Sequence, residues 1–131
     1  MSASSVRKRA APDGPSVLVV EDEGLVRALI VETLREAGCA VTEAATADEA
    51  VRMLKCAAEP DVLVTDVKLP GAMNGIDLAE RLRRTLPRMK VIVTSGHAGP
   101  EDAACVADAF LAKPFALKEL VGEVRLLAAA H

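Results

Sequence analysis

Short apolar runs alternate with amphipathic stretches along most of this chain, beginning at Ser16. The runs are rich in valine and leucine, which is typical of strands, and the stretches between them repeat apolar residues every three or four positions, as helices do. The predicted strands lie at residues 17–20, 40–44, 61–65, 91–93 and 110–112. The predicted helices lie at residues 26–37, 47–54, 76–86 and 117–128, with a short one that starts near residue 99.

This regular alternation predicts an α/β fold: a three-layer, doubly wound (βα)5 domain with a five-stranded parallel sheet and helices on both faces. The run at 40–44 is partly polar, so we expect it near an edge of the sheet. The segment between Ser95 and Phe110 is short, so the fourth helix should be abbreviated. Residues 1–15 show no periodicity and predict a flexible N-terminal leader, and residues 16–131 form the expected domain.

Composition excludes several classes of function. Phe110 and Phe115 are the only aromatic residues among the 131, which argues against flavin binding and against base stacking on single-stranded nucleic acid. The net charge of −3 provides no general attraction to nucleic acid or to an anionic membrane. No apolar run is long enough to cross a bilayer, and three cysteines without CxxC spacing fit a reducing compartment. We therefore expect a cytoplasmic protein.

Chemically active side chains follow four of the five predicted strands. In a parallel sheet the carboxyl ends of the strands meet at one edge, so these side chains should gather there. They are Glu21, Asp22, Glu23, Asp66, Thr94, Ser95 and Lys113. Clustered carboxylates repel one another, and Mg²⁺, which prefers oxygen ligands, would relieve that repulsion. With a lysine and a hydroxyl nearby, the set suits phosphoryl transfer, although no glycine-rich nucleotide loop is present.

Four segments of the chain together resemble the receiver domain of bacterial response regulators over Ser16 to about Ala128. They are VLVVEDE at 17–23, VLVTDVKLPG at 62–71, VIVTSGH at 91–97 and FLAKPF at 110–115. The resemblance implies a flavodoxin-like strand order, 2-1-3-4-5. Because the last predicted helix ends close to His131, we expect a stand-alone, single-domain member of the family without an output domain of its own.

The resemblance also implies a role for each residue at this edge of the sheet. Asp66 would be the phosphoacceptor. Asp22 would bind Mg²⁺ directly, Glu21 would help through water, and the Lys68 backbone carbonyl would join Asp66 in completing the protein ligands. Glu21 stands where the family commonly has Asp, and the loop after Pro70 is one residue longer than in chemotaxis-type members.

Three further residues receive roles from the same resemblance. Lys113 would pair with the bound phosphoryl group, and Lys113–Pro114 is often a cis peptide bond in this family. Ser95, rather than Thr94, would be the switch hydroxyl, and Phe110 the switch aromatic. The implied partner is a sensor histidine kinase or a histidine phosphotransfer protein. The implied output is contact with an unknown protein, formation of a homodimer or service as a phosphate sink, without enzymatic turnover of a separate substrate.

Plainer interpretations fit some of these residues. Glu21, Asp22 and Glu23 are also what the start of a helix favours, because its N-terminus attracts negative charge. Ser95 could serve only the turn that follows it, and Phe110 could be an ordinary core residue. Two rival functions therefore stand beside the first. One is a pseudo-receiver that binds a partner without phosphorylation, and the other is a flavodoxin-like cofactor binder, which the lack of Trp and Tyr disfavours.

Overall fold

Five strands in the described part of the chain form one parallel sheet in the order β2-β1-β3-β4-β5. The strands are β1 (Ser16–Val20), β2 (Ala40–Ala44), β3 (Val62–Asp66), β4 (Lys90–Ser95) and β5 (Ala109–Ala112). The computed structural model describes residues 14–130, so the predicted leader at 1–15 lies almost entirely outside the described residues. The strand order is the flavodoxin-like order 2-1-3-4-5 that the resemblance implied.

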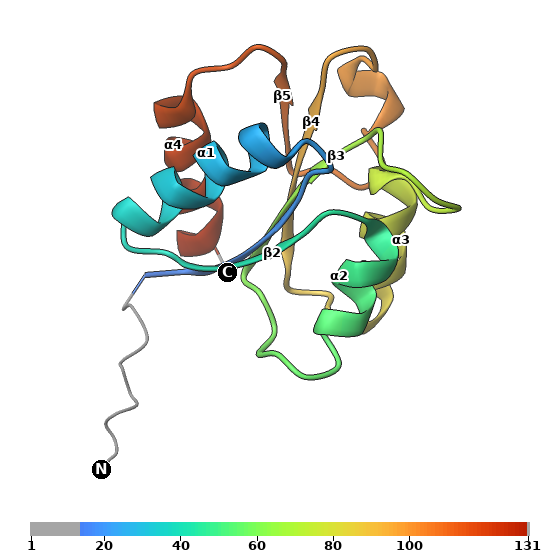
Figure 1. The fold of residues 1–131 in the computed structure, drawn as a ribbon, viewed down its shortest axis with the longest axis horizontal. Coiled ribbons are helices and arrows are strands. Elements are labelled where there is room, and N and C mark those ends of the chain that lie inside the picture. The colour runs from blue at the N-terminus through green and yellow to red at the C-terminus, as the bar shows by residue number, and fades with distance from the viewer. Residues whose placement is uncertain (1–13, 131) are drawn as a thin grey trace.

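Helices cover both faces of the sheet, as the alternation predicted. They are α1 (Gly24–Glu36), α2 (Ala47–Met53), α3 (Gly75–Thr85) and α4 (Leu117–Ala129). Figure 1 shows α1 and α4 on one side of the sheet and α2 and α3 on the other. The register of β1 explains the two layers, because Val17 and Val19 join the core under α1 and α4, whereas Leu18 and Val20 join the opposite core.

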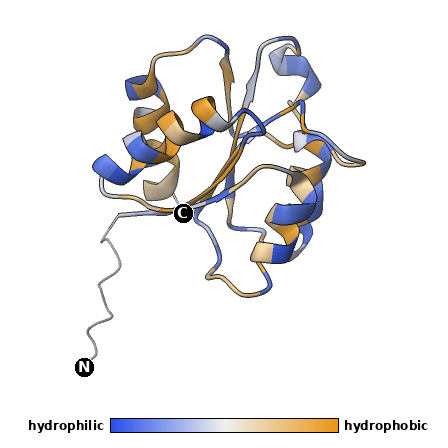
Figure 2. Ribbon diagram, in the orientation of Figure 1, coloured by the Kyte–Doolittle hydropathy of each residue, from blue (hydrophilic) through white to orange (hydrophobic). Residues whose placement is uncertain are grey.

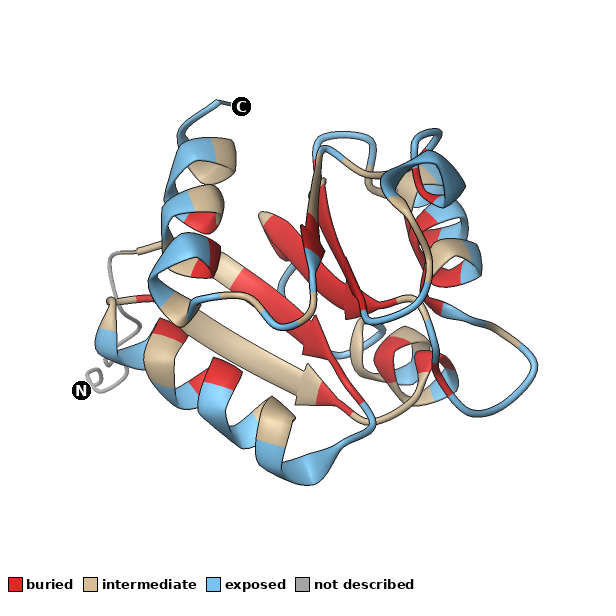
Figure 3. Cartoon of the chain, turned by 90° about the horizontal axis from the view of Figure 1, so that it is seen from above, coloured by how far each residue is buried: buried red, intermediate tan, exposed pale blue. Residues whose placement is uncertain are grey.

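Burial follows the place of each strand in the sheet. All five residues of β3 are buried, whereas β2, at the edge, is half-buried over most of its length (Figure 3). Figure 2 shows that the strands are largely apolar while the helices mix apolar and polar residues, since each helix has one face in water. The partly polar composition of residues 40–44 is thus explained by its edge position, as predicted.

The connection between β4 and β5 contains no α-helix. A single 3-10 turn, Pro100–Asp102, stands where the fourth helix of a complete (βα)5 unit would lie. Few residues lie between Pro100 and Asp108, which is too short a segment for a full helix. Asp108 lies beside β4, where its carboxylate accepts a hydrogen bond of 2.8 Å from the Val91 N–H. The abbreviation predicted for this helix is therefore confirmed, and Ala103 and Val106 are buried in its place.

Across residues 14–130, the helices are all too short or too polar to cross a bilayer.

Candidate functional site

Side chains from separate strands converge where the carboxyl ends of β1, β3, β4 and β5 meet. Glu21 and Asp22 directly follow β1, Asp66 is the last residue of β3 and Ser95 is the last residue of β4. Lys113 comes directly after β5. The parallel register places these ends together, since Asp66 pairs with Thr94 and Ser95 pairs with Ala112. The sheet therefore delivers all of these predicted site residues to one edge.

Three of the carboxylates form a compact cluster. Oxygen atoms of Glu21, Asp22 and Asp66 all lie within 4.8 Å of one another. Glu21 is buried, Asp66 is 8% exposed, and Asp22 is open to solvent. Hard oxygen donors with one solvent-facing member suit Mg²⁺, which retains several of its waters when it binds protein carboxylates. The donor set therefore fits the predicted metal.

Lys113 supplies the positive charge in this cluster. Its Nζ donates to Glu21 Oε1 at 3.0 Å and to Asp66 Oδ2 at 2.9 Å. Burial works against the charged ammonium, but hydrogen bonds and attraction to the two carboxylates outweigh it and raise the pKa of Lys113. One lysine thus holds two carboxylates from different strands.

The carboxylate of Glu21 lies in a poorly solvated position. Burial is the largest influence on it and raises its pKa, and the nearby charge of Asp66 acts in the same direction. Hydrogen bonds from Lys113 and from the Glu23 N–H, the latter at 3.2 Å, oppose that rise. A bound cation would favour the ionised form of Glu21. The electrostatics of this cluster therefore favour the binding of a cation.

An open hollow at this edge exposes the cluster to solvent. Its lining includes Asp22, Glu23, Asp66, Val67, Lys68, Leu69, Pro70, Asn74, Ser95, Gly96, His97, Ala98 and Lys113. Lys68 and His97 have exposed side chains among these lining residues. The Lys68 N–H donates to Asp66 Oδ1 at 3.3 Å, so this loop lies against the acid. A role for the Lys68 carbonyl as a metal ligand stays a prediction.

Ser95 and Phe110 occupy positions that the plainer interpretations also describe. Ser95 Oγ accepts hydrogen bonds from the N–H of His97 at 3.1 Å and of Ala98 at 2.8 Å, which is turn chemistry. Phe110 is half-buried against the core beneath α2 and α3. Their switch roles therefore stay predictions. The implied cis peptide bond between Lys113 and Pro114 is confirmed.

Sequence reasoning missed the residues that hold the backbone of this site. The Arg27 side chain donates a hydrogen bond to the backbone carbonyl oxygen of Glu21, in the loop that carries Glu21 and Asp22. Gly75, the first residue of α3, lies so close to the end of β3 that a Cβ there would overlap the Asp66 carbonyl oxygen. The sequence features that could have identified them are an arginine in the first turns after an acidic run and a glycine at a helix start. Both features are common in proteins without such a role.

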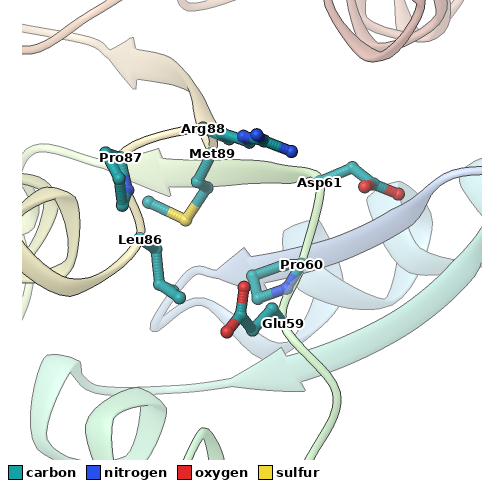
Figure 4. Close-up of a pocket in the computed structure, with 7 residues that line it drawn as sticks. All are labelled: Glu59, Pro60, Asp61, Leu86, Pro87, Arg88 and Met89. Atoms are coloured by element: carbon teal, nitrogen blue, oxygen red, sulfur yellow. The ribbon is translucent and has the colours of Figure 1, made fainter. Parts of the chain in front are cut away.

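A second hollow lies at the opposite end of the strands, next to the starts of β3 and β4. Figure 4 shows the residues that line it: Glu59, Pro60, Asp61, Leu86, Pro87, Arg88 and Met89. Asp61 accepts a hydrogen bond of 2.8 Å from the Ser16 N–H, so it supports the start of β1. None of these lining residues belongs to the acidic cluster. Among the described residues, we therefore place the candidate site at the carboxyl ends of the strands.

Comparisons with known proteins agree with this geometry. A family model described as the response regulator receiver domain matches residues 17–125. Sensor kinase CckA of Brucella abortus is 43% identical over 117 residues, which cover 84% of this chain and 12% of the kinase. The probable transcriptional regulatory protein TcrX of Mycobacterium tuberculosis is 33% identical over 124 residues, which cover 92% of this chain and 52% of that protein. The chain thus spans a part of each relative.

Solved structures share the fold. The receiver domain of the Francisella response regulator 1452 superposes with a TM-score of 0.80 at 29% identity and covers 89% of this chain and 98% of that one. Response regulator TrrA of Thermotoga maritima, solved in complex with Mg²⁺ and BeF, has a TM-score of 0.77 at 27% identity, over 87% of this chain and 99% of that one. With its strand order, its acidic cluster and the match over residues 17–125, this chain belongs to the response regulator receiver domain family.

Proposed function

We propose that this receiver domain is a Mg²⁺-dependent phosphoacceptor in a two-component phosphorelay, and that Asp66 takes the phosphoryl group. The observation that carries the proposal is the grouping of three carboxylates within 4.8 Å, one of which, Asp66, lies 2.9 Å from the Lys113 ammonium. Acids, a lysine and a hydroxyl from separate strands provide what phosphoryl transfer needs, which is positioning and charge neutralisation. The complex of TrrA with Mg²⁺ and BeF supports the choice of metal.

The proposed reaction is an exchange of one bond to phosphorus for another. An Asp66 carboxylate oxygen attacks the phosphorus of a phosphohistidine, a P–O bond forms, the P–N bond breaks, and the departing imidazole nitrogen takes a proton from solvent. Lys113 then turns its ammonium from the Asp66 carboxylate to the phosphoryl oxygens. Mg²⁺, held by Glu21, Asp22, Asp66 and the Lys68 carbonyl, would neutralise charge on the transferred group.

The open hollow supports a macromolecular donor, because a phosphohistidine on another protein must approach Asp66 directly. Sensor kinases among the relatives make a sensor histidine kinase, or a histidine phosphotransfer protein, the proposed partner. We place this exchange in the cytoplasm, with no separate substrate turned over. Contact with an output protein, homodimer formation and draining of phosphate from a shared kinase are the outputs we consider, since phosphorylation would bias an equilibrium between two conformations.

Intact-protein mass spectrometry tests the proposal directly. The protein is incubated with Mg²⁺ and either acetyl phosphate or phosphoramidate, whose P–N bond resembles that of phosphohistidine. We expect one phosphoryl adduct in the wild type, none in Asp66→Asn and an unchanged adduct in Asp48→Asn, which alters an exposed aspartate on α2. An adduct that persists in Asp66→Asn would place the chemistry elsewhere.

The rival function, a pseudo-receiver that binds its partner without phosphorylation, makes the opposite prediction. No adduct would form with either donor, nor with a phosphorylated histidine kinase, although the protein remains folded. The buried Glu21 and its ion pair with Lys113 favour the phosphoacceptor. Removing charged groups from water has a desolvation cost, and a module that only binds a partner does not need buried charges at this position.

A further inference from the structure

Arg27 connects three parts of the molecule at the base of the acidic cluster. It lies in α1, and its Nη1 donates to the backbone carbonyl oxygen of Glu21 at 2.8 Å. Its Nε donates to Glu43 Oε1, on the edge strand β2, at 3.1 Å. Its own N–H donates to the Glu23 carbonyl oxygen at 2.8 Å. One residue thus joins a helix, a strand and the loop that carries the acids.

The carbonyl group that Arg27 contacts lies between two of the carboxylates that are proposed to bind the metal. The carbonyl of Glu21 belongs to the peptide unit between Glu21 and Asp22, and rotation of that unit would redirect both side chains. On the strand side, the Glu21 N–H donates to the Ala44 carbonyl oxygen at 3.1 Å. Arg27 holds the other side. Glu21 is therefore held on both sides: its N–H, in the preceding peptide unit, bonds to Ala44, and its carbonyl, in the peptide unit shared with Asp22, bonds to Arg27.

The geometry suits arginine in particular. Its guanidinium is planar and rigid, so Nε and Nη1 can donate to two acceptors that lie in fixed directions, which a single ammonium cannot reproduce. Only 23% of the Arg27 side chain is exposed, and the bond to the Glu43 carboxylate is charge-assisted. Glu43 thereby anchors the guanidinium on β2, next to the end of β1, where Glu43 pairs with Val19.

We propose that Arg27 is a positioning residue for the Mg²⁺ site: it fixes the Glu21–Asp22 peptide in the orientation that brings both carboxylates to Asp66. Arg27 touches neither the metal nor the phosphoryl group and acts through these two acids. The inference rests on the proposed function, since it concerns the same metal site. It differs from a purely structural role because it predicts a loss of metal affinity that exceeds any loss of stability.

The test compares Arg27→Gln with Arg35→Gln. Arg35 is a matched control because it also lies in α1 and donates to a β2 backbone carbonyl, that of Val41 at 3.1 Å. It is two helical turns further along α1, about 12 Å from Arg27 at 1.5 Å per residue. Mg²⁺ affinity is measured on the unphosphorylated proteins by NMR titration of backbone amides, and thermal unfolding is measured without Mg²⁺ for the same samples.

We expect Arg27→Gln to weaken Mg²⁺ binding by about tenfold or more, as loss of a group that orients metal ligands usually does. Arg35→Gln should bind as the wild type does. In the acetyl phosphate reaction, Arg27→Gln should need correspondingly more Mg²⁺ for half-maximal rate but approach the wild-type rate at saturation. Arg27→Lys should restore part of the affinity. If Arg27→Gln does not fold, Glu43→Gln provides the measurement, since Glu43 is 41% exposed and its loss releases the guanidinium.

The outcomes separate this inference from the proposed function. The positioning role alone would be overturned if the wild-type protein is phosphorylated as proposed and the Mg²⁺ affinity of Arg27→Gln is within twofold of the wild-type affinity. Equal weakening in Arg27→Gln and Arg35→Gln would also overturn it, because the effect would then be general destabilisation. A wild-type protein that neither binds Mg²⁺ nor accepts phosphate would overturn both.

Discussion

Lys113 and Asp66 stand 47 residues apart in the chain, yet the lysine Nζ lies 2.9 Å from Oδ2 of the aspartate. The contact crosses β4, which lies between β3 and β5 in the sheet. The same ammonium is 3.0 Å from Glu21 Oε1. In this conformation the lysine neutralises the residue proposed to be the nucleophile, so its charge supports the fold before any phosphoryl group arrives.

Substitution of Lys113 by methionine should therefore destabilise the protein. Two poorly solvated carboxylates would lose their shared cation, and we expect the free energy of unfolding to fall by roughly 1–2 kcal/mol, a figure reduced for partial exposure of the lysine. Added Mg²⁺ should restore part of the loss, because it supplies positive charge to the same acids. Urea unfolding followed by circular dichroism measures both effects. Lys118→Met on α4 is the control, and an equal loss there would contradict this account.

The raised pKa of Glu21 predicts how stability depends on pH. In the unfolded chain this carboxyl group ionises near its ordinary pKa of 4.5, whereas in the folded protein it stays protonated to higher pH. The unfolded state therefore loses its proton first, and this group lowers the free energy of unfolding as pH rises from about 4.5 through the folded pKa. Below 4.5 both states are protonated and the effect is absent.

Glu21→Gln should abolish this contribution. We expect the variant to be more stable than the wild type at neutral pH in the presence of EDTA, with a difference that shrinks as the pH falls toward 4.5. Denaturant unfolding at a series of pH values provides the measurement. A difference that stays constant across the series would show that the substitution acts through packing and not through the charge of Glu21.

Magnesium should stabilise the folded protein through Asp22. We expect the wild type to gain about 1.4 kcal/mol when free Mg²⁺ is about ten times its dissociation constant. Asp22 is exposed, so Asp22→Asn should unfold at nearly the same temperature as the wild type without metal but gain little from Mg²⁺. Glu23→Gln, also exposed and one residue further along, lies outside the cluster and should retain the gain. Equal loss of the gain in both variants would argue for a diffuse charge effect.

Gly75 should tolerate no side chain. A Cβ at this position would overlap the Asp66 carbonyl oxygen and lie 2.8 Å from Thr65 Oγ1, so α3 would have to move away from β3. We expect Gly75→Ala to cost about 3 kcal/mol or more, at the upper end of single substitutions, and to lower the rate of phosphorylation.

Gly122 provides the opposite comparison. It lies within α4, and a Cβ there would meet nothing within 4 Å. Gly122→Ala should therefore stabilise the protein by about 0.5–1 kcal/mol, because alanine favours the helix more than glycine does. Thermal unfolding of the two variants side by side tests the pair, and a similar effect of both substitutions would refute the packing argument for Gly75.

The local sequence was sufficient for much of the fold. The apolar run Val17–Val20 and the amphipathic stretches around it predicted strands and helices because their periods of two and 3.6 residues reflect backbone geometry. A parallel sheet sends the carboxyl ends of its strands to one edge, so the order of elements also predicted that Glu21, Asp66 and Lys113 would meet there. The order of the elements along the chain and the residues that follow each strand, both of which can be read from the sequence, therefore located the candidate site.

The tertiary structure alone decided which groups became partners. The contact of Arg27 with Glu43 and the Glu21 carbonyl depends on how α1 lies over β2, and the clash that excludes a side chain at Gly75 depends on the approach of α3 to β3. Such contacts depend on differences of an ångström between segments distant in the chain, whereas periodicity records only which face of an element is buried.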